Sequence, residues 1–159
     1  MRTQGRKRKK EPSRLQAEVK QNKPFALLET EVSLNLLRTQ GVLRGPADAL
    51  LRASGLSASG YNVLRILRGA GTTGLPCRDI GDRMVTRVPD VTRLLDRLTT
   101  DGLVSRERAR DDRRVVLTQI TSEGRRLVDS LDEPVETLAK ESLGHMSQHE
   151  LRTLSRLLE

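Results

Sequence analysis

Residues 86–114 read TRVPDVTRLLDRLTTDGLVSRERARDDRR, and this stretch decides the fold. Its first half repeats apolar residues at the spacing of one helical face, which predicts a helix over about residues 87–101. We expect Thr86 to be the N-cap, because a threonine hydroxyl can accept from a free N–H of the first turn. Pro89 then falls in that turn, where its missing N–H is harmless. Gly102 is expected to end the helix.

The second half of the stretch changes its apolar period from that of a helix to that of strands. Residues 103–110 and 113–120 predict two strands, and Asp111-Asp112 predicts the turn between them. Arginines alternate with other residues along the first strand, which predicts a solvated basic face on a small hairpin. These arginines are Arg106, Arg108 and Arg110.

Two short helices are predicted upstream of the helix at 87–101. Ser57 is a good N-cap for a helix over 57–69, and Leu56 and Tyr61 occupy the two positions of a hydrophobic staple. Pro76 opens a second helix over 76–84. Two short helices, a longer helix and a basic hairpin together predict a winged helix-turn-helix lobe over residues 57–120.

Leucine-rich helices are predicted on both sides of the lobe. Residues 25–56 show helical spacing of leucines, and Gly45-Pro46 should kink or split that helix. Residues 121–159 predict a helix capped by Thr121 and a last helix opened by the capping box Ser147 to Glu150. The expected fold class is mainly α with a small β-hairpin wing (α+β), in which terminal helices bury their leucines against a second copy.

We name eight candidate dimerisation residues on these terminal helices. They are Leu28, Val32, Leu36, Leu138, Leu151, Leu154, Leu157 and Leu158.

Composition narrows the class of protein. The chain has 159 residues, which favours a single domain. Hydrophobic residues are only 35% and aromatic residues 1%, and one cysteine excludes an internal disulfide and a Cys-rich zinc site. No apolar run reaches the roughly 18–20 residues that span a membrane, and the basic N-terminus lacks the apolar segment of a secretory signal. We therefore expect a cytoplasmic protein without membrane contact.

The net charge of +8 is concentrated at the N-terminus. Residues 1–24 hold nine basic and two acidic residues, whereas residues 25–159 have a net charge of +1. Because the tail has few apolar residues, we expect it to be mobile. It is either an electrostatic arm on nucleic acid or a solvated tail without a specific role. Residues 25–159 use arginine in place of lysine almost throughout, which suits phosphate and guanine, but a genomic base composition that favours arginine codons accounts for most of these arginines.

The candidate nucleic-acid residues follow from the geometry of the major groove. The groove admits one α-helix, whose N-terminal residues reach base edges, while arginines at a hairpin tip can enter the adjacent minor groove. Residues 78–114 hold ten arginines and eight acids. Binding to DNA must therefore depend on where individual arginines lie and not on a large net charge. The candidates are Thr86, Arg87, Pro89, Asp90, Thr92, Arg93, Arg97, Arg110, Arg113 and Arg114.

Two of these candidates have open alternatives. Asp90 either accepts from cytosine or supports the helix N-terminus through the helix dipole. Arg97 either contacts phosphate or forms an ion pair with Asp101 four residues later.

The ordered set of segments resembles the MarR-type winged-helix regulators of bacteria and archaea. Residues 91–98 (VTRLLDRL) resemble the family's recognition helix, and Asp101-Gly102-Leu103-Val104 with Arg106 resembles its exit into the wing. Asp111-Asp112-Arg113-Arg114 is similar to the wing tip. The resemblance implies that Asp112 holds an arginine in place and that Arg113 reaches DNA.

The C-terminal part of the resemblance extends it to about residues 29–158. Ile120-Thr121-Ser122-Glu123-Gly124 fills the place of the family's L-T-x-x-G, and residues 143–158 are similar to the closing helix. The resemblance implies an obligate homodimer on a pseudo-palindromic operator and a pocket whose small-molecule effector releases DNA in many members. The leading hypothesis is a regulator of this kind that acts as a repressor. Phe25 and Tyr61 are the only aromatic rings available to such an effector.

No catalytic constellation is recognisable, so we predict a protein that is not an enzyme and has no cofactor or metal. Cys77 is either structural or a sensor of oxidants. His145 and His149 are either solvated or bracket a metal, although a helix boundary separates them. Two other functions compete: a winged-helix dimer that binds protein partners, and a non-specific DNA binder driven by its tail. The operator, the effector and repression against activation are not readable from the sequence.

Overall fold

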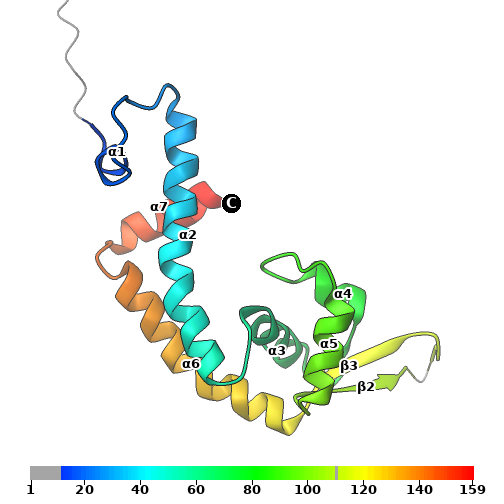
Figure 1. Ribbon diagram of the computed structural model, residues 1–159. Coiled ribbons are helices and arrows are strands. Elements are labelled where there is room, and N and C mark those ends of the chain that lie inside the picture. The colour runs from blue at the N-terminus through cyan, green and yellow to red at the C-terminus, as the bar shows by residue number, and fades with distance from the viewer. Residues whose placement is uncertain (1–11, 110) are drawn as a thin grey trace, which may run out of the picture. The chain divides into compact units, whose positions relative to one another are not determined.

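The computed structural model describes residues 12–109 and 111–159 (Figure 1), and these residues divide into two compact units on either side of the boundary between Val42 and Leu43. The predicted fold class is confirmed: the chain is mainly helical with a small antiparallel sheet. In chain order the elements are α1 (Arg14–Glu18), α2 (Leu28–Ala53), α3 (Ala58–Ala70), β1 (Leu75–Pro76), α4 (Cys77–Asp82), α5 (Val91–Thr100), β2 (Val104–Arg108), β3 (Val116–Ile120), α6 (Ser122–Leu143) and α7 (Gln148–Leu158).

The first unit contains a short helix that the sequence pattern does not predict. The Ser13 side chain accepts from the Gln16 amide at the start of α1, and Leu15 is 4% exposed. Glu18 at the end of α1 forms an ion pair of 2.8 Å with Arg38 in α2. The predicted tail therefore contains a helix at Arg14–Glu18, residues 1–11 lie outside the described part, and the mobility of the tail stays a prediction.

Helix α2 runs through Pro46 without interruption, so the predicted split at Gly45-Pro46 is wrong. A proline inside a helix removes one N–H and crowds the preceding turn, but it ends the helix only when nothing compensates. Residues 44–46 are exposed or nearly so, and water can satisfy the carbonyl that loses its partner. Leu51, 3% exposed, anchors the C-terminal end of α2 in the core of the second unit.

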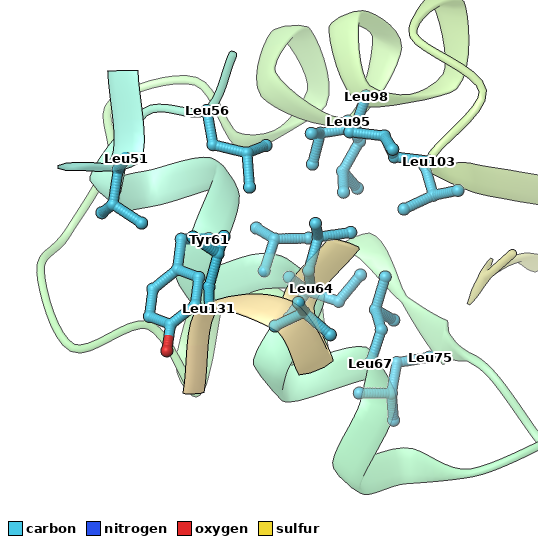
Figure 2. Close-up of a cluster of buried hydrophobic side chains, with 14 residues drawn as sticks. Leu51, Leu56, Tyr61, Leu64, Leu67, Leu75, Leu95, Leu98, Leu103 and Leu131 are labelled. Carbon is cyan, nitrogen blue, oxygen red and sulfur yellow. The ribbon is translucent and has the colours of Figure 1, made fainter. Parts of the chain in front are cut away.

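The core of the second unit gathers side chains from α3, α5 and α6 around one apolar cluster (Figure 2). Val63, Leu64, Leu95 and Val128 are all 0% exposed. Leu56 and Tyr61, the predicted staple, are both buried in the cluster on either side of the Ser57 cap, whose hydroxyl accepts from the Gly60 amide. The staple and cap fix where α3 begins, as predicted.

The sheet has the order β1-β3-β2 and is antiparallel throughout. Strand β2 pairs with β3 from Val104 opposite Ile120 to Arg108 opposite Val116. Strand β1 pairs Leu75 with Thr118 and was not predicted, because two residues are too few to show an alternating pattern. The strands of the hairpin are shorter than predicted, and the connection between them runs from residue 109 to 115 rather than through a two-residue turn.

One junction joins the end of α5, the hairpin and the start of α6. Gly102 has φ +72°, and the amides of Gly102 and Leu103 return to the carbonyls of Thr99 and Leu98, which closes α5. The Leu103 carbonyl then accepts from the Thr121 amide at 3.1 Å. A Cβ on Gly124 would lie 2.1 Å from that carbonyl oxygen, so only glycine fits there.

Helix α6 starts at the predicted Thr121 cap, whose hydroxyl accepts from the Gly124 amide, and continues through Pro134 to Leu143. Helix α7 starts with the predicted capping box, in which Ser147 and Glu150 bond reciprocally. These bonds from Ser147 hold the pKa of the Glu150 carboxyl below its ordinary value.

A charged link ties α3 to α6 beside the core. Arg68 donates from both terminal nitrogens to Asp132, at 2.7 and 3.0 Å, and also to Asp129 at 2.6 Å. The Arg68 side chain is 23% exposed and that of Asp132 42%, so the link is only partly screened by water. Hydrogen bonding from Arg68 lowers the pKa of Asp132.

The Asp132–Arg68 link should make stability depend on pH. Because the folded-state pKa of Asp132 is lowered, its contribution is present above the ordinary pKa of about 4 and is lost as the pH falls below it. Chemical denaturation at one protein concentration should show Asp132→Asn to be less stable than the original chain at pH 7. The gap should be about 1 kcal/mol and should close toward pH 2–3. A gap that stays constant across this range would contradict the assignment.

Candidate nucleic-acid interface

Helix α5 divides cleanly into a buried face and an exposed face. Leu95 and Leu98 are 0% and 3% exposed and belong to the core cluster. Thr92, Arg93 and Arg97 are exposed. This division arises from the 3.6-residue helical period, and it leaves polar and basic side chains along the outer surface of the helix.

The entry into α5 differs from the prediction. Asp90, not Thr86, is the N-cap: its carboxylate accepts from the Arg93 amide at 2.9 Å. Thr86, Arg87 and Pro89 are therefore in the loop before the helix rather than in its first turn, and all three are exposed. An aspartate caps a helix at least as well as a threonine does, because its carboxylate accepts strongly from the free N–H groups of the first turn.

Contacts in the structure bear on the alternatives left open for Asp90 and Arg97. The Asp90 carboxylate supports the helix N-terminus directly, because one of its oxygens is bonded to the Arg93 amide. The Nε atom of Arg97 lies 4.0 Å from an Asp101 oxygen, a long ion pair on an exposed surface. Such a pair contributes little to stability and leaves the Arg97 guanidinium available for another contact.

The turn of the wing is built around Asp112. Its carboxylate accepts from the Arg114 amide at 2.9 Å and from the Arg114 side chain at 3.1 and 3.2 Å. The Asp112 carbonyl also accepts from the Val115 amide, which closes a four-residue turn. These Arg114 bonds, the side-chain ones first, lower the pKa of Asp112. Asp112 thus holds Arg114, while Arg113 is exposed at the other central position of the turn.

The first strand of the wing is tied to α5 by an ion pair that the sequence pattern missed. Arg106 in β2 donates from a terminal nitrogen to the Asp96 carboxylate in α5. The Arg106 side chain is only 25% exposed, and its Nε is buried without a partner among the described residues. The prediction that Arg106 belongs to a solvated face is therefore wrong, whereas Arg108 is exposed and Arg110 lies outside the described residues.

Three further candidates, Cys77, Tyr61 and Phe25, are half-buried or buried. Cys77 is half-buried against the core, and its sulfur lies 3.6 Å from the Thr92 hydroxyl oxygen. The Tyr61 ring is 8% exposed, with the Arg65 guanidinium 5.9 Å from its centre. Phe25, in the other unit, is half-buried. A role for Tyr61 and Phe25 in binding an effector stays a prediction.

The candidate dimerisation residues include exposed apolar side chains in both units. In the first unit Leu28, Val32 and Leu36 are 68%, 48% and 46% exposed on α2. In the second unit Leu157 and Leu158 are 74% and 60% exposed on α7, which contributes no buried residue. The other three, Leu138, Leu151 and Leu154, are half-buried.

None of the helices within residues 12–109 and 111–159 combines the length and the apolar composition that a membrane-spanning helix needs. In the same part of the chain no cluster of three His, Cys, Asp or Glu side chains is arranged to hold a metal ion, and His145 and His149 are both exposed.

Comparison with known proteins places the chain beside transcriptional regulators. The family model described as MarR family matches residues 56–116. The chain is 34% identical over 111 residues to the uncharacterized HTH-type transcriptional regulator YfiV of Bacillus subtilis, covering 65% of this chain and 68% of YfiV.

Two solved structures add a likeness of fold. A MarR transcription factor from Planctomyces limnophilus is 39% identical, with 84% of this chain and 97% of that one covered and a TM-score of 0.66. CouR from Rhodococcus jostii RHA1, solved bound to p-coumaroyl-CoA, is 26% identical, with 84% and 93% covered and a TM-score of 0.71.

The Asp96–Arg106 pair should hold the wing on α5. Replacing Asp96 with Asn keeps the side-chain shape but removes the charge, so amide hydrogen exchange in β2 and β3 should accelerate by about fivefold or less, the range expected of a partly exposed pair. The matched control is Asp101→Asn, whose pair with Arg97 lies within one helix segment. Equal exchange rates in both variants would rule out this role for the pair.

Proposed function

The chain belongs to the MarR family of DNA-binding transcriptional regulators, and from this premise we propose that it acts as a homodimeric repressor on a pseudo-palindromic operator. The family is not enzymatic, in agreement with the sequence. In the proposal, α5 enters a major groove, and the turn at Asp112–Val115 places Arg113 against the neighbouring minor groove.

One observation carries the proposal for DNA: the cationic side chains that would read it are exposed and not held by carboxylates. Arg87, Arg93 and Arg113 form no ion pair with any acid of the described residues. Other arginines of the lobe, such as Arg106 and Arg114, are held by Asp96 and Asp112. The carboxylates therefore stiffen the framework, while the remaining guanidinium groups are available to phosphates and guanine edges.

The homodimer is supported by the exposed leucines of α2 and α7. Large apolar side chains at 68% and 74% exposure, such as Leu28 and Leu157, are costly in water when they cluster on helices. A second copy would cover them, and a two-fold dimer would present two copies of α5 to two half-sites.

An effector completes the proposal. CouR was solved with p-coumaroyl-CoA, which supports ligand control in this chain too. Of the two rings available to an effector, Tyr61 is 8% exposed in the core, and Phe25 is only half-buried and therefore the more accessible.

The proposal is tested by selecting bound sequences from random DNA duplexes. A homodimeric reader should enrich two inverted half-sites about one helical turn apart. A chain lacking residues 1–11 should enrich the same motif, because those residues carry charge rather than sequence information. Loss of all binding with this deletion would favour the non-specific, tail-driven binder. No binding by either chain at low salt would favour a dimer that acts through protein partners.

Arg113 should contribute directly to DNA binding. On the selected duplex, Arg113→Gln should weaken binding by about ten- to a hundredfold and reduce the slope of log K against log salt by roughly two, since each copy loses one cationic contact. Fluorescence anisotropy at several salt concentrations measures both. Arg126→Gln, which changes an exposed α6 arginine paired with Glu123, is the control and should alter neither. An unchanged slope for Arg113→Gln would refute the assignment.

The exposed leucines should set the oligomeric state. Sedimentation velocity should show a species of twice 17.8 kDa for the original chain. Leu28→Glu with Leu157→Glu should weaken the dimer by about a hundredfold or more, because unpaired charges would be buried in the interface. The control is Val116→Glu, at an exposed valine of β3, and it should remain dimeric. A monomeric original chain at micromolar concentration would overturn the proposal.

A further inference from the structure

An exposed valine stands beside the residues proposed to read DNA. Within residues 57–120, apart from Arg110, the large apolar side chains that are exposed are those of Val85 and Val116, at 88% and 43%. Val85 lies in the loop between α4 and α5, directly before Thr86 and Arg87. It is therefore the most exposed large apolar side chain of the described lobe, and it precedes the helix end that approaches base edges.

The backbone at Val85 is held in place from a different helix. The Val85 amide donates to the side-chain oxygen of Asn62 in α3 at 2.9 Å. On the other side of the loop, the Asp90 cap fixes the start of α5. The branched Cβ of a valine restricts rotation about χ1, so an anchored amide leaves its two methyl groups few orientations.

From these contacts we propose that Val85 is a specificity-determining residue that packs its methyl groups against the 5-methyl group of a thymine in each half-site. The major groove presents one apolar group, the thymine methyl, and small apolar side chains recognise it by contact. An isolated exposed valine is ordinary on a protein surface, but Val85 differs in lying directly before the residues that lead into α5 and in having its amide anchored by Asn62. The inference rests on the proposed function, because it requires α5 to read DNA.

The two residues that directly follow Val85 are polar, so its methyl groups would make an apolar contact within an otherwise polar interface with DNA. Thr86 and Arg87, its exposed neighbours, can bond to phosphates or base edges while the valine covers a methyl group. Burying about one methyl pair is worth a few-fold in affinity, so the expected effect on a single half-site is about three- to fivefold.

The test replaces single thymines by deoxyuridine in the duplex enriched by selection, which removes the methyl group and nothing else. When one thymine of a half-site is replaced, the affinity of the original chain, measured by anisotropy, should fall about three- to fivefold. The affinity of Val85→Ala should be the same with thymine or uracil at that position. The control Val116→Ala removes the same methyl groups from the wing and should remain sensitive to uracil. Unchanged thermal unfolding of Val85→Ala checks that the loop substitution leaves the fold intact.

The possible outcomes distinguish a failure of the role of Val85 from a failure of the proposed function. The role of Val85 is contradicted if Val85→Ala loses as much affinity on uracil substitution as the original chain does. It is also contradicted if uracil at every position leaves the affinity of the original chain unchanged. Either result leaves the proposed function as a DNA-binding regulator intact. If selection enriches no motif at all, the proposed function itself fails before any uracil is introduced, and the role of Val85 falls with it.

Discussion

The winged helix-turn-helix lobe depends on the carbonyl groups of Gly102 and Leu103. The Leu103 amide closes α5 on Leu98, its carbonyl accepts from the Thr121 amide, and the Gly102 carbonyl accepts from the Thr121 hydroxyl at 2.8 Å. The end of the exposed helix, the first strand of the wing and the first turn of α6 therefore share one set of backbone bonds. Gly124 permits this approach because any Cβ would collide with the Leu103 carbonyl.

Charge in the lobe is organised by pairing rather than by excess. Residues 78–114 hold ten arginines and eight acids, so this part of the lobe has a net charge of only +2. Asp96 and Asp112 each take one arginine and thereby position the wing and its turn. Arg87, Arg93 and Arg113 are left to solvent, with no carboxylate partner in the described part of the chain. Most of the net charge of +8 lies on residues 1–24, away from this arrangement in the sequence.

Local signals predicted the element starts well wherever the cap and the first turn carry the whole interaction. Ser57, Thr121 and Ser147 cap α3, α6 and α7 as expected, because each hydroxyl bonds within three residues. The prediction failed at Thr86, where two capping residues compete and Asp90 wins. It also failed for β1, which exists only because β3 lies beside it. The inward turn of Arg106 needed Asp96, ten residues away, and alternation along a strand cannot report such a partner.

The sequence by itself determined the class of fold, the order of helices α2 to α7 with the wing, and the family, because helical period, caps and turn residues act over a few positions and survive in any context. The tertiary structure alone decided which arginines are occupied and which are available, whether α2 continues through Pro46, and that Val85 is anchored through Asn62 yet exposed. These features depend on groups far apart in the chain that meet only after folding, so their energies belong to the packed molecule and not to any local stretch.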